Sequence, residues 1–373
     1  MEYILFTIFL SSFAIYEVIK NKKSKKLWNI TIVVYILFFA FRGLSGFDLK
    51  EYMLFFRETG DFLSLLNNDI SLKFINLELG FQVLISIIKI FTNKYEVFSI
   101  LITIIDILII WKAFYKLSPY PILSLAIFMG LGGLIQQLNL LRNTKGILIF
   151  IYSLTLLEKN KAIYIFSNIV GMTIHRSSVI YILLTDFFKR KWYKYNKIII
   201  LYFAIGLIIS IFKINIISFI LINTSELLEK FNLFPGIIYK IKYYLNIPEF
   251  IVYREIGENI IEKIFTFILI YFYREKINNY KYGKIFFNIY LIYIFIYFYC
   301  RSLAIVYDRF EMIFIMSYWF LYPILIKIVK NKILKITFLS LILMYSIRTI
   351  YVNILPYKAL EYTNLILNLV LEK

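Results

Sequence analysis

The sequence has few of the residues from which proteins build disulfides and metal centres. Among its 373 residues are one cysteine, Cys300, and one histidine, His175. A single cysteine excludes a disulfide within the chain, and a lone histidine without a cysteine cluster argues against a zinc site. We therefore expect no structural metal and no disulfide framework.

Charged residues are also scarce, at 17% of the chain, whereas hydrophobic residues make up 61% and the mean hydropathy is +0.76. A soluble globular protein has no means of covering so much apolar surface, and apolar runs of roughly 17–25 residues are typical of membrane-spanning helices. The sequence predicts an all-α, polytopic integral membrane protein with about 12–14 transmembrane helices. No internal repeat or soluble domain is visible, so we expect residues 1–373 to form a single transmembrane domain.

Acidic residues are outnumbered, with 23 Asp and Glu against 42 Lys and Arg, which gives a net charge of +19. Short hydrophilic loops hold 18 of the 42 basic residues, in the blocks Lys20–Lys26, Lys189–Lys197, Arg274–Lys284 and Lys327–Lys335. This distribution follows the positive-inside rule for cytoplasmic loops. We therefore expect a membrane lipid environment and no nucleic-acid partner.

The first apolar run, Tyr3–Ile19, has no basic region before it and no small-residue cleavage site after it. Its basic block follows it instead, which predicts an uncleaved first span with the N-terminus outside. From that orientation, two long polar segments, about 44–77 and 223–258, are expected to form loops on the outer face.

Several polar side chains interrupt the apolar segments. The segment Ala162–Phe188 is long for one helix and short for two, and His175-Arg176-Ser177-Ser178 lies at its centre, which predicts a helix broken at His175. Asp106 lies inside a span and is expected to be a buried hydrogen-bonding partner or part of an ion path. Lys145 is expected to add to the positive field on the outer face.

Arginine at or within a membrane bundle is costly, so each one requires a partner or a function. Taken singly, such an arginine is most simply an interfacial residue whose head group reaches water. A group of arginines on the outer face instead suggests a phosphate or pyrophosphate site, because guanidinium binds such anions in a bidentate way. The candidates are Arg42, Arg142, Arg176 and Arg309.

The candidates for proton transfer are one histidine and two carboxylates. His175 has the one side-chain type whose unperturbed pKa lies near neutrality, although a lone histidine is more often a satisfied core residue. Asp48 follows two glycines and is equally well explained as a helix N-cap. Glu78 begins an apolar run, where a carboxylate also favours a helix N-terminus.

The order of these motifs resembles that of the EpsG family, which is related to Wzy-type O-antigen and capsule polymerases. The matching pieces are Phe41-Arg42, Gly46-Phe47-Asp48 with Tyr52, Glu78-Leu79-Gly80-Phe81, Leu141-Arg142-Asn143, Ile174-His175-Arg176-Ser177 and Asp308-Arg309-Phe310. Their order holds over about residues 35–325. Two positions depart from the family pattern: Asn143 replaces a glutamine, and Phe47 occupies a position that is often small.

The resemblance implies a membrane glycosyltransferase on the outer face of the bacterial cytoplasmic membrane. Its substrates would be oligosaccharide units linked to undecaprenyl pyrophosphate, which are joined into capsule, O-antigen or exopolysaccharide without a metal or cofactor. A flippase and a chain-length regulator are the expected protein partners. The expected roles are pyrophosphate binding by Arg42, Arg142, Arg176 and Arg309, acid–base catalysis by His175, Asp48 and Glu78, and sugar binding by Tyr52, Tyr243 and Tyr244.

Other interpretations remain open at this stage. Tyr243 and Tyr244 are also explained as membrane-interface tyrosines. The same basic cavity would serve a transporter or flippase for lipid-linked glycans, which requires access to both faces. A membrane acyltransferase that modifies surface glycans would also use an intramembrane histidine, together with an acyl donor.

Overall fold

The computed structural model of the protein describes residues 1–61, 77–247, 252–255, 257 and 259–365. Throughout these residues the regular elements are helices, and the pairing of Arg42 with Asn364 is an isolated bridge. The prediction of an all-α membrane protein is confirmed. Part of each predicted outer loop, residues 62–76 of the first and 248–251, 256 and 258 of the second, lies outside the described residues.

The chain folds into two compact units, one of residues 1–185 and 322–373 and the other of residues 186–321. Two helices continue across the boundaries between the units, α12 (Thr185–Lys189) and α19 (Met316–Ile328). The remaining helices of the first unit are α1 (Glu2–Ile19), α2 (Lys25–Phe39), α3 (Leu49–Glu58), α5 (Leu79–Lys89), α6 (Tyr95–Leu117), α7 (Pro121–Phe128), η2 (Met129–Gly133), α8 (Leu134–Asn139), α9 (Leu141–Leu157), α10 (Lys161–Ile174), η3 (Arg176–Ser178), α11 (Val179–Leu183), α20 (Lys332–Asn353) and η6 (Lys358–Leu360).

Among the candidate membrane spans of the first unit, the helical segment Pro121–Asn139 is the most deeply buried, with 89% of its most apolar stretch inside the protein. Its first part, α7, is buried on all sides and almost wholly apolar, so it can pack against neighbours all around. Gly132 takes a positive φ of 85°, which bends the segment within η2. Gly130 packs so closely against α20 that an added Cβ would lie 2.2 Å from Cβ of Ser346.

The helices α9 and α10 pack against each other after a short turn, in which the Asn160 side chain caps α10 by accepting from the backbone N–H of Ile163. α10 ends at Ile174 because His175 takes an extended backbone (φ −150°, ψ 119°), and a 3₁₀ turn then leads into α11. The predicted break at His175 is therefore confirmed. Close approach at this break requires a small residue, since a Cβ on Gly146 would lie 2.4 Å from Oγ of Ser178.

Within the described part of the chain, four helical segments are long and apolar enough to cross a membrane: α1, α6, Pro121–Asn139 and α20. Two bent pairs raise the number to six if each pair is one span: α13 (Asn196–Ile211) with α14 (Ile216–Lys230), bent by 93°, and α18 (Ala304–Phe314) with α19, bent by 42°. Other apolar segments, such as α5, α10 and α17 (Gly283–Tyr299), fold as helices of 10–17 residues. Several of the segments expected to be crossings are therefore short or bent helices.

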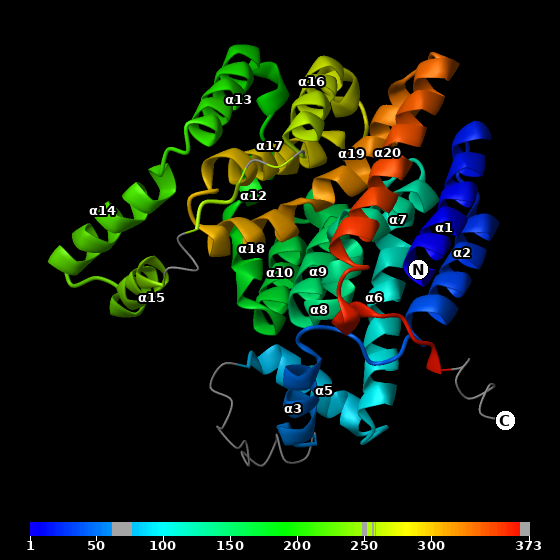
Figure 1. The fold of residues 1–373 in the computed structure, drawn as a ribbon, viewed down its shortest axis with the longest axis horizontal. Coiled ribbons are helices and arrows are strands. Elements are labelled where there is room, and N and C mark those ends of the chain that lie inside the picture. Colours follow the sequence, from blue (N-terminus) through cyan, green and yellow to red (C-terminus); the bar gives the residue numbers. More distant parts are fainter. Residues whose placement is uncertain (62–76, 248–251, 256, 258, 366–373) are drawn as a thin grey trace. The chain divides into compact units, whose positions relative to one another are not determined.

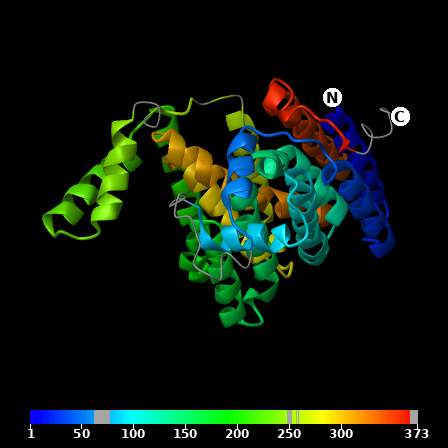
Figure 2. The same ribbon diagram turned by 90° about the horizontal axis from the view of Figure 1, so that it is seen from below.

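Helices α3 and α5 lie across the end of the first unit at which α2 ends and α6 begins (Figures 1 and 2). Their apolar sides pack into a common cluster that includes Phe55, Phe56 and Phe81. α3 is amphipathic, so its other side remains exposed. This layer positions Asp48, Tyr52 and Glu78 at that end of the first unit.

The second unit contains η4 (Trp192–Lys194), α13 (Asn196–Ile211), α14 (Ile216–Lys230), α15 (Pro235–Asn246), α16 (Asn259–Asn278), α17 and α18 (Ala304–Phe314). Its α13 and α16 are joined by stacked rings of Phe203 and Phe267, whose centroids are 3.7 Å apart. Although the sequence predicts a loop over 223–258, the described part of that segment is largely helical, in α14 and α15.

Candidate active site

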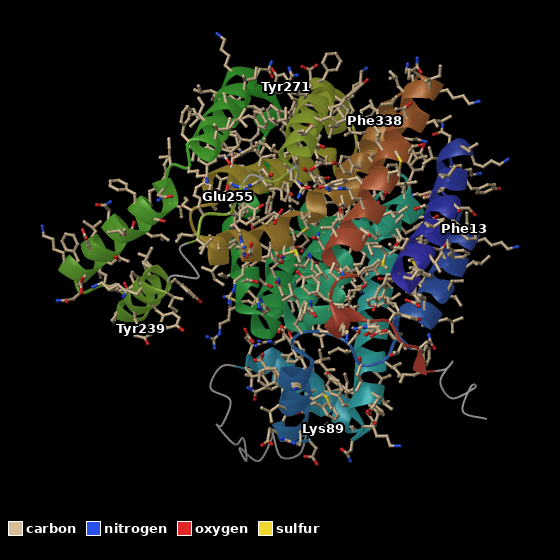
Figure 3. The ribbon with its side chains drawn as sticks, viewed as in Figure 1. Phe13, Lys89, Tyr239, Glu255, Tyr271 and Phe338 are labelled. Atoms are coloured by element: carbon tan, nitrogen blue, oxygen red, sulfur yellow. The ribbon has the colours of Figure 1, made fainter. Side chains whose placement is uncertain are left out.

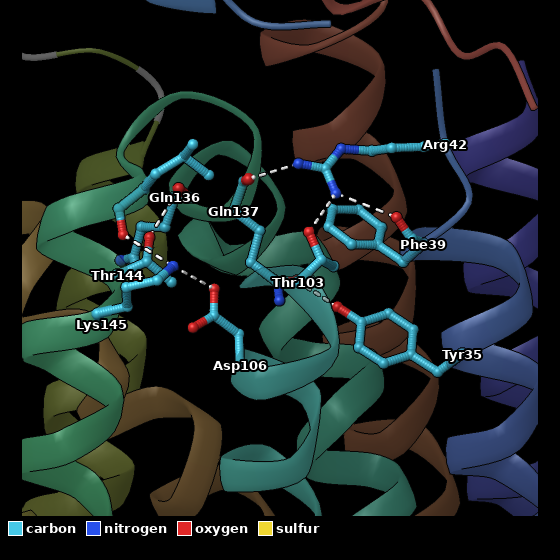
Figure 4. Close-up of polar contacts among 10 residues, drawn as sticks. Tyr35, Phe39, Arg42, Thr103, Asp106, Gln136, Gln137, Thr144 and Lys145 are labelled. Carbon is cyan, nitrogen blue, oxygen red and sulfur yellow. Dashed lines mark hydrogen bonds and ion pairs between the residues drawn. The ribbon is translucent and has the colours of Figure 1, made fainter. Parts of the chain in front are cut away.

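Arg42 follows the C-terminal end of α2, where its side chain turns into the protein and is only 4% exposed. Its guanidinium donates to the carbonyl of Phe39 (3.0 Å), to Oγ1 of Thr103 (3.2 Å) and to the carbonyl of Gln137 (3.0 Å). The ring of Phe39 lies 4.4 Å from the guanidinium carbon. Arg42 therefore ties α2 to α6 and α8, as the right-hand part of Figure 4 shows.

A buried ion pair lies beside this network. Nζ of Lys145 is 3.1 Å from Oδ2 of Asp106, and each side chain is 3% exposed. Lys145 also donates to the carbonyl of Leu141, so its charge is held between α6 and α9 (Figure 4). The expectation that Asp106 is a buried partner is confirmed, whereas the placement of Lys145 in an outer positive field is wrong, because its ammonium group lies inside the helix bundle.

A second polar cluster lies where α5, α9 and the break after α10 meet. Glu78, the N-cap residue of α5, accepts from Arg142 through Oε2 (2.7 Å) and from the backbone N–H of Arg176 through Oε1 (3.4 Å). Arg142 is 21% exposed and Glu78 is 9% exposed, so this pair is less buried than the pair of Asp106 and Lys145. One carboxylate thus connects two of the predicted arginines.

His175 has its own support within the same cluster. Its Nδ1 lies 2.6 Å from Oγ of Ser177, and the Ser177 hydroxyl donates to Oδ1 of Asn143 (3.3 Å). Because that hydroxyl proton points to Asn143, the geometry favours the tautomer with its proton on Nδ1 and its lone pair on Nε2. In that tautomer, Nε2 is the ring nitrogen that can accept a proton.

Helix α3 contributes its two predicted residues to the same cluster. The pKa of the Asp48 carboxyl is raised by burial, which the positive charge of Arg142 partly offsets. Burial also raises the pKa of Tyr52, again against the effect of Arg142. Arg142 lies 5.4 Å from the Phe55 ring, so α3 covers one side of its guanidinium. Asp48 is the N-cap residue of α3, but its side chain makes no capping hydrogen bond.

The loop before α3 reaches the cluster through glycine. Gly46 has φ of 135°, and a Cβ there would lie 2.6 Å from the carbonyl oxygen of Leu138. The next residue, Phe47, donates its backbone N–H to Oδ1 of Asn139 (2.8 Å). This close approach to the end of α8 places Asp48 and α3 over Arg142.

An open pocket of about 440 Å³ adjoins the cluster. Its lining includes Glu78 and Arg176 together with Thr173 and the apolar side chains of Leu77, Leu79, Met172 and Val179. The buried Nε of Arg142 has no hydrogen-bond partner among the described residues. The site therefore combines charged groups that fit an anion with an apolar wall that fits a lipid chain.

The structure brings together six of the ten predicted site residues in the first unit: Asp48, Tyr52, Glu78, Arg142, His175 and Arg176. Arg42 belongs to the same unit, but its hydrogen bonds go to protein groups. Arg309, exposed on α18, and Tyr243 and Tyr244, in contact with each other on α15, belong to the second unit. Their roles remain predictions.

Three polar neighbours of the predicted segment 41–52 were not found from the sequence: Thr103, Gln137 and Asn139. The signal for the last two was the polar run Gln136-Gln137-Leu138-Asn139 in an otherwise apolar segment. The described residues contain no group of three or more His, Cys, Asp or Glu side chains that could hold a metal ion.

Comparison with family models connects this geometry to a known family. The model of the EpsG family matches residues 25–364, which include every candidate residue discussed above. The chain belongs to the EpsG family. Comparison with curated proteins gave no match, and comparison with solved structures gave none either.

Membership of the EpsG family identifies the chain as a polysaccharide polymerase-type membrane protein. In this EpsG chain, the matched motifs from distant segments contact one another: Glu78 and Arg142 are 64 positions apart, and Glu78 and Arg176 are 98 apart. The beginning of α9 contributes to both clusters, because Arg142 and Asn143 belong to the candidate site whereas Lys145, about one turn later, belongs to the buried core.

Proposed function

We propose that this EpsG-family chain is a glycosyltransferase that joins oligosaccharide units linked to undecaprenyl pyrophosphate. The reaction would take place at the outer face of the bacterial cytoplasmic membrane, with the N-terminus on that side. The observation that carries the proposal is the convergence of Glu78, Arg142, His175 and Arg176 beside a pocket with apolar walls. Family membership supplies the reaction class.

In the proposed reaction, a hydroxyl of the acceptor sugar attacks the anomeric carbon of the donor sugar. A new glycosidic C–O bond forms, the bond from the anomeric carbon to the pyrophosphate oxygen breaks, and undecaprenyl pyrophosphate leaves with the electron pair. Nε2 of His175 takes the hydroxyl proton, for which the Ser177 contact holds the ring in the suitable tautomer. Pyrophosphate is the leaving group, so no metal or nucleotide enters the balance.

The arginines are assigned to the pyrophosphate. Arg176 is exposed at the pocket, and Arg142 is oriented by Glu78, so the two present positive charge where negative charge develops as the bond breaks. Glu78 is then a positioning residue, because its oxygens bond to Arg142 and to the backbone of Arg176. Asp48 lies within the field of Arg142 and would orient the acceptor hydroxyl.

The test is complementation of a deletion strain with single variants, read as polysaccharide chain length and as the amount of lipid-linked single units. We expect Arg142→Ala and His175→Ala each to lower the rate of polymerisation by roughly 10²-fold or more. Long chains should then be absent, and lipid-linked single units should accumulate. Lys112→Ala, an exposed position on α6, is the matched control.

Chains of wild-type length in both site variants would refute the assignment. Purified protein in liposomes separates the alternatives, because a flippase would move lipid-linked units without extending them. An acyltransferase would leave chain length unchanged and remove acyl groups, which mass spectrometry of the glycan detects. Chain extension that stops after treatment with a metal chelator would contradict the metal-independent mechanism.

A further inference from the structure

Helix α3 has a basic surface on the side opposite to its contacts with the candidate active site. Residues 50, 53, 54 and 57 follow the i, i+3, i+4, i+7 spacing that places side chains on one helical face. Lys50 and Arg57 begin and end this face, and the apolar side chains of Met53 and Leu54, 39% and 37% exposed, lie between them. None of these four residues has a role in the proposed reaction.

A pocket of about 650 Å³ lies along this face, bounded also by the end of α5 and the beginning of α6. Its lining combines the three cations Lys50, Arg57 and Lys89 with Asn93, Tyr95 and apolar side chains. The pocket therefore offers three positive charges and a carboxamide over an apolar floor. Among the described residues that line it there is no carboxylate.

Lys89, which is labelled in Figure 3, lies at the end of α5 and forms part of the pocket wall. Its ammonium group donates to the carbonyl of Arg57 (3.2 Å) and to that of Thr59, and it lies 5.1 Å from the centre of the Phe56 ring. These contacts hold the charge in place without neutralising it. Among the described residues, the acids that act on these cations are Glu58, whose Oε1 lies 3.3 Å from Nε of Arg57, and Asp61, whose charge acts on Lys89.

Apolar side chains are exposed beside the cations. Ile87, Ile90 and Phe91, at and after the end of α5, are 41%, 61% and 76% exposed. Exposed apolar groups next to clustered Lys and Arg are the combination by which membrane proteins hold anionic lipid head groups. A sugar or a soluble anion has no apolar chain that would pack against these side chains.

We propose that this pocket binds the phosphate group of a membrane lipid, with Lys50, Arg57 and Lys89 around the phosphate and the lipid chain along Met53 and Leu54. The site is distinct from the candidate active site, because Glu78 and Lys89 are at opposite ends of α5, about 16 Å apart at 1.5 Å per residue. A bound lipid would hold α3 and α5 against the membrane surface. The inference goes beyond the proposed function and does not depend on it.

Native mass spectrometry of the purified protein tests this proposal with three probes: phosphatidylglycerol, phosphatidylcholine and a polyprenyl pyrophosphate. The test variant is Lys50→Gln/Arg57→Gln, which removes two exposed charges and leaves the fixed Lys89. The control is Lys25→Gln/Lys26→Gln, which removes two charges from an exposed basic pair on α2. Thermal melting of each variant verifies that it is folded.

We expect the wild-type protein to retain phosphatidylglycerol in preference to phosphatidylcholine. The test variant should retain phosphatidylglycerol roughly tenfold less well or worse, because it lacks two basic side chains that each attract an anionic lipid. The control variant should retain it as well as the wild-type protein does. Glu58→Gln removes a competing carboxylate and should strengthen retention. High salt should weaken it.

Competition between the two anionic probes identifies the source of the phosphate. Retention of phosphatidylglycerol in excess polyprenyl pyrophosphate assigns the pocket to a phospholipid, and displacement that depends on Lys50 and Arg57 assigns it to a lipid pyrophosphate. Both outcomes support the proposal. Equal retention in the test and control variants, or retention of phosphatidylcholine at the level of phosphatidylglycerol, would overturn it.

Discussion

The ion pair of Asp106 and Lys145 gives the sharpest stability prediction, because both side chains are 3% exposed. Removing one partner from such a pair leaves an uncompensated buried charge, which typically costs about 3–5 kcal/mol. We therefore expect Asp106→Ala and Lys145→Ala each to lower the free energy of unfolding by about that amount. Replacing both residues by apolar ones of similar size, as in Asp106→Leu/Lys145→Met, should restore most of the loss, since neither member of the pair is then left as an unpaired charge.

The matched control is an ion pair at the surface. Lys213 and Glu255 are separated by 2.7 Å, which is closer than the buried pair, but their side chains are 53% and 73% exposed. Lys213→Ala should cost less than about 1 kcal/mol, because solvent screens the charges. Denaturant titration of the purified protein in mixed micelles, followed by tryptophan fluorescence, measures all these variants on one scale.

Two results would refute this reasoning. Equal costs for Asp106→Ala and Lys213→Ala would show that burial does not determine the strength of the pair. A double apolar variant no more stable than the single variants would show that the loss comes from packing and not from unpaired charge. The variants that lose most stability should also make the shortest polysaccharide chains, because Lys145 lies one turn after Arg142 on α9.

Two further predictions concern the loop that leads into α3. Gly46→Ala should destabilise the protein by about 1–3 kcal/mol, since the new Cβ meets the Leu138 carbonyl and the positive φ of 135° suits only glycine. The control in the same unfolding measurement is Gly236→Ala, which should be nearly neutral because no atom lies within 4 Å of the added Cβ. Burial raises the pKa of Asp48 above its ordinary value of 3.8. The folded state therefore keeps this proton to a higher pH than the unfolded state does. The free energy of unfolding should fall as pH rises from about 3.8 through the folded-state pKa. Asp48→Asn should remove that fall, and an unchanged pH profile of stability would contradict the assignment.

The two polar clusters of the first unit also explain why Arg42 and Arg142 differ despite their similar sequence settings. Arg42 follows a helix directly and is surrounded by the carbonyls of Phe39 and Gln137, which leaves it 4% exposed. Arg142 lies in the first turn of α9, beside a carboxylate and a pocket. The first therefore holds helices together, and the second is the one for which we propose a role in substrate binding.

The amino-acid sequence by itself determined the fold class, the basic loops and the break at His175. Each follows from local composition, because a long apolar run requires a helix in the membrane and a run of polar side chains within it interrupts that helix. Motif order over most of the chain also indicated the family. These features need no knowledge of which segments are neighbours.

Only the tertiary structure decided which charged residues meet. Hydropathy does not show which side of an apolar helix faces inward, so the inward turn of Arg42 and Lys145 was not readable. The contact between Glu78 and Arg142 depends on how α5 packs against α9, a long-range arrangement that no local pattern encodes. The lengths of α5, α10 and α17 likewise depend on packing partners. The residue types of the site came from the sequence, and their division into core and site came from the packing.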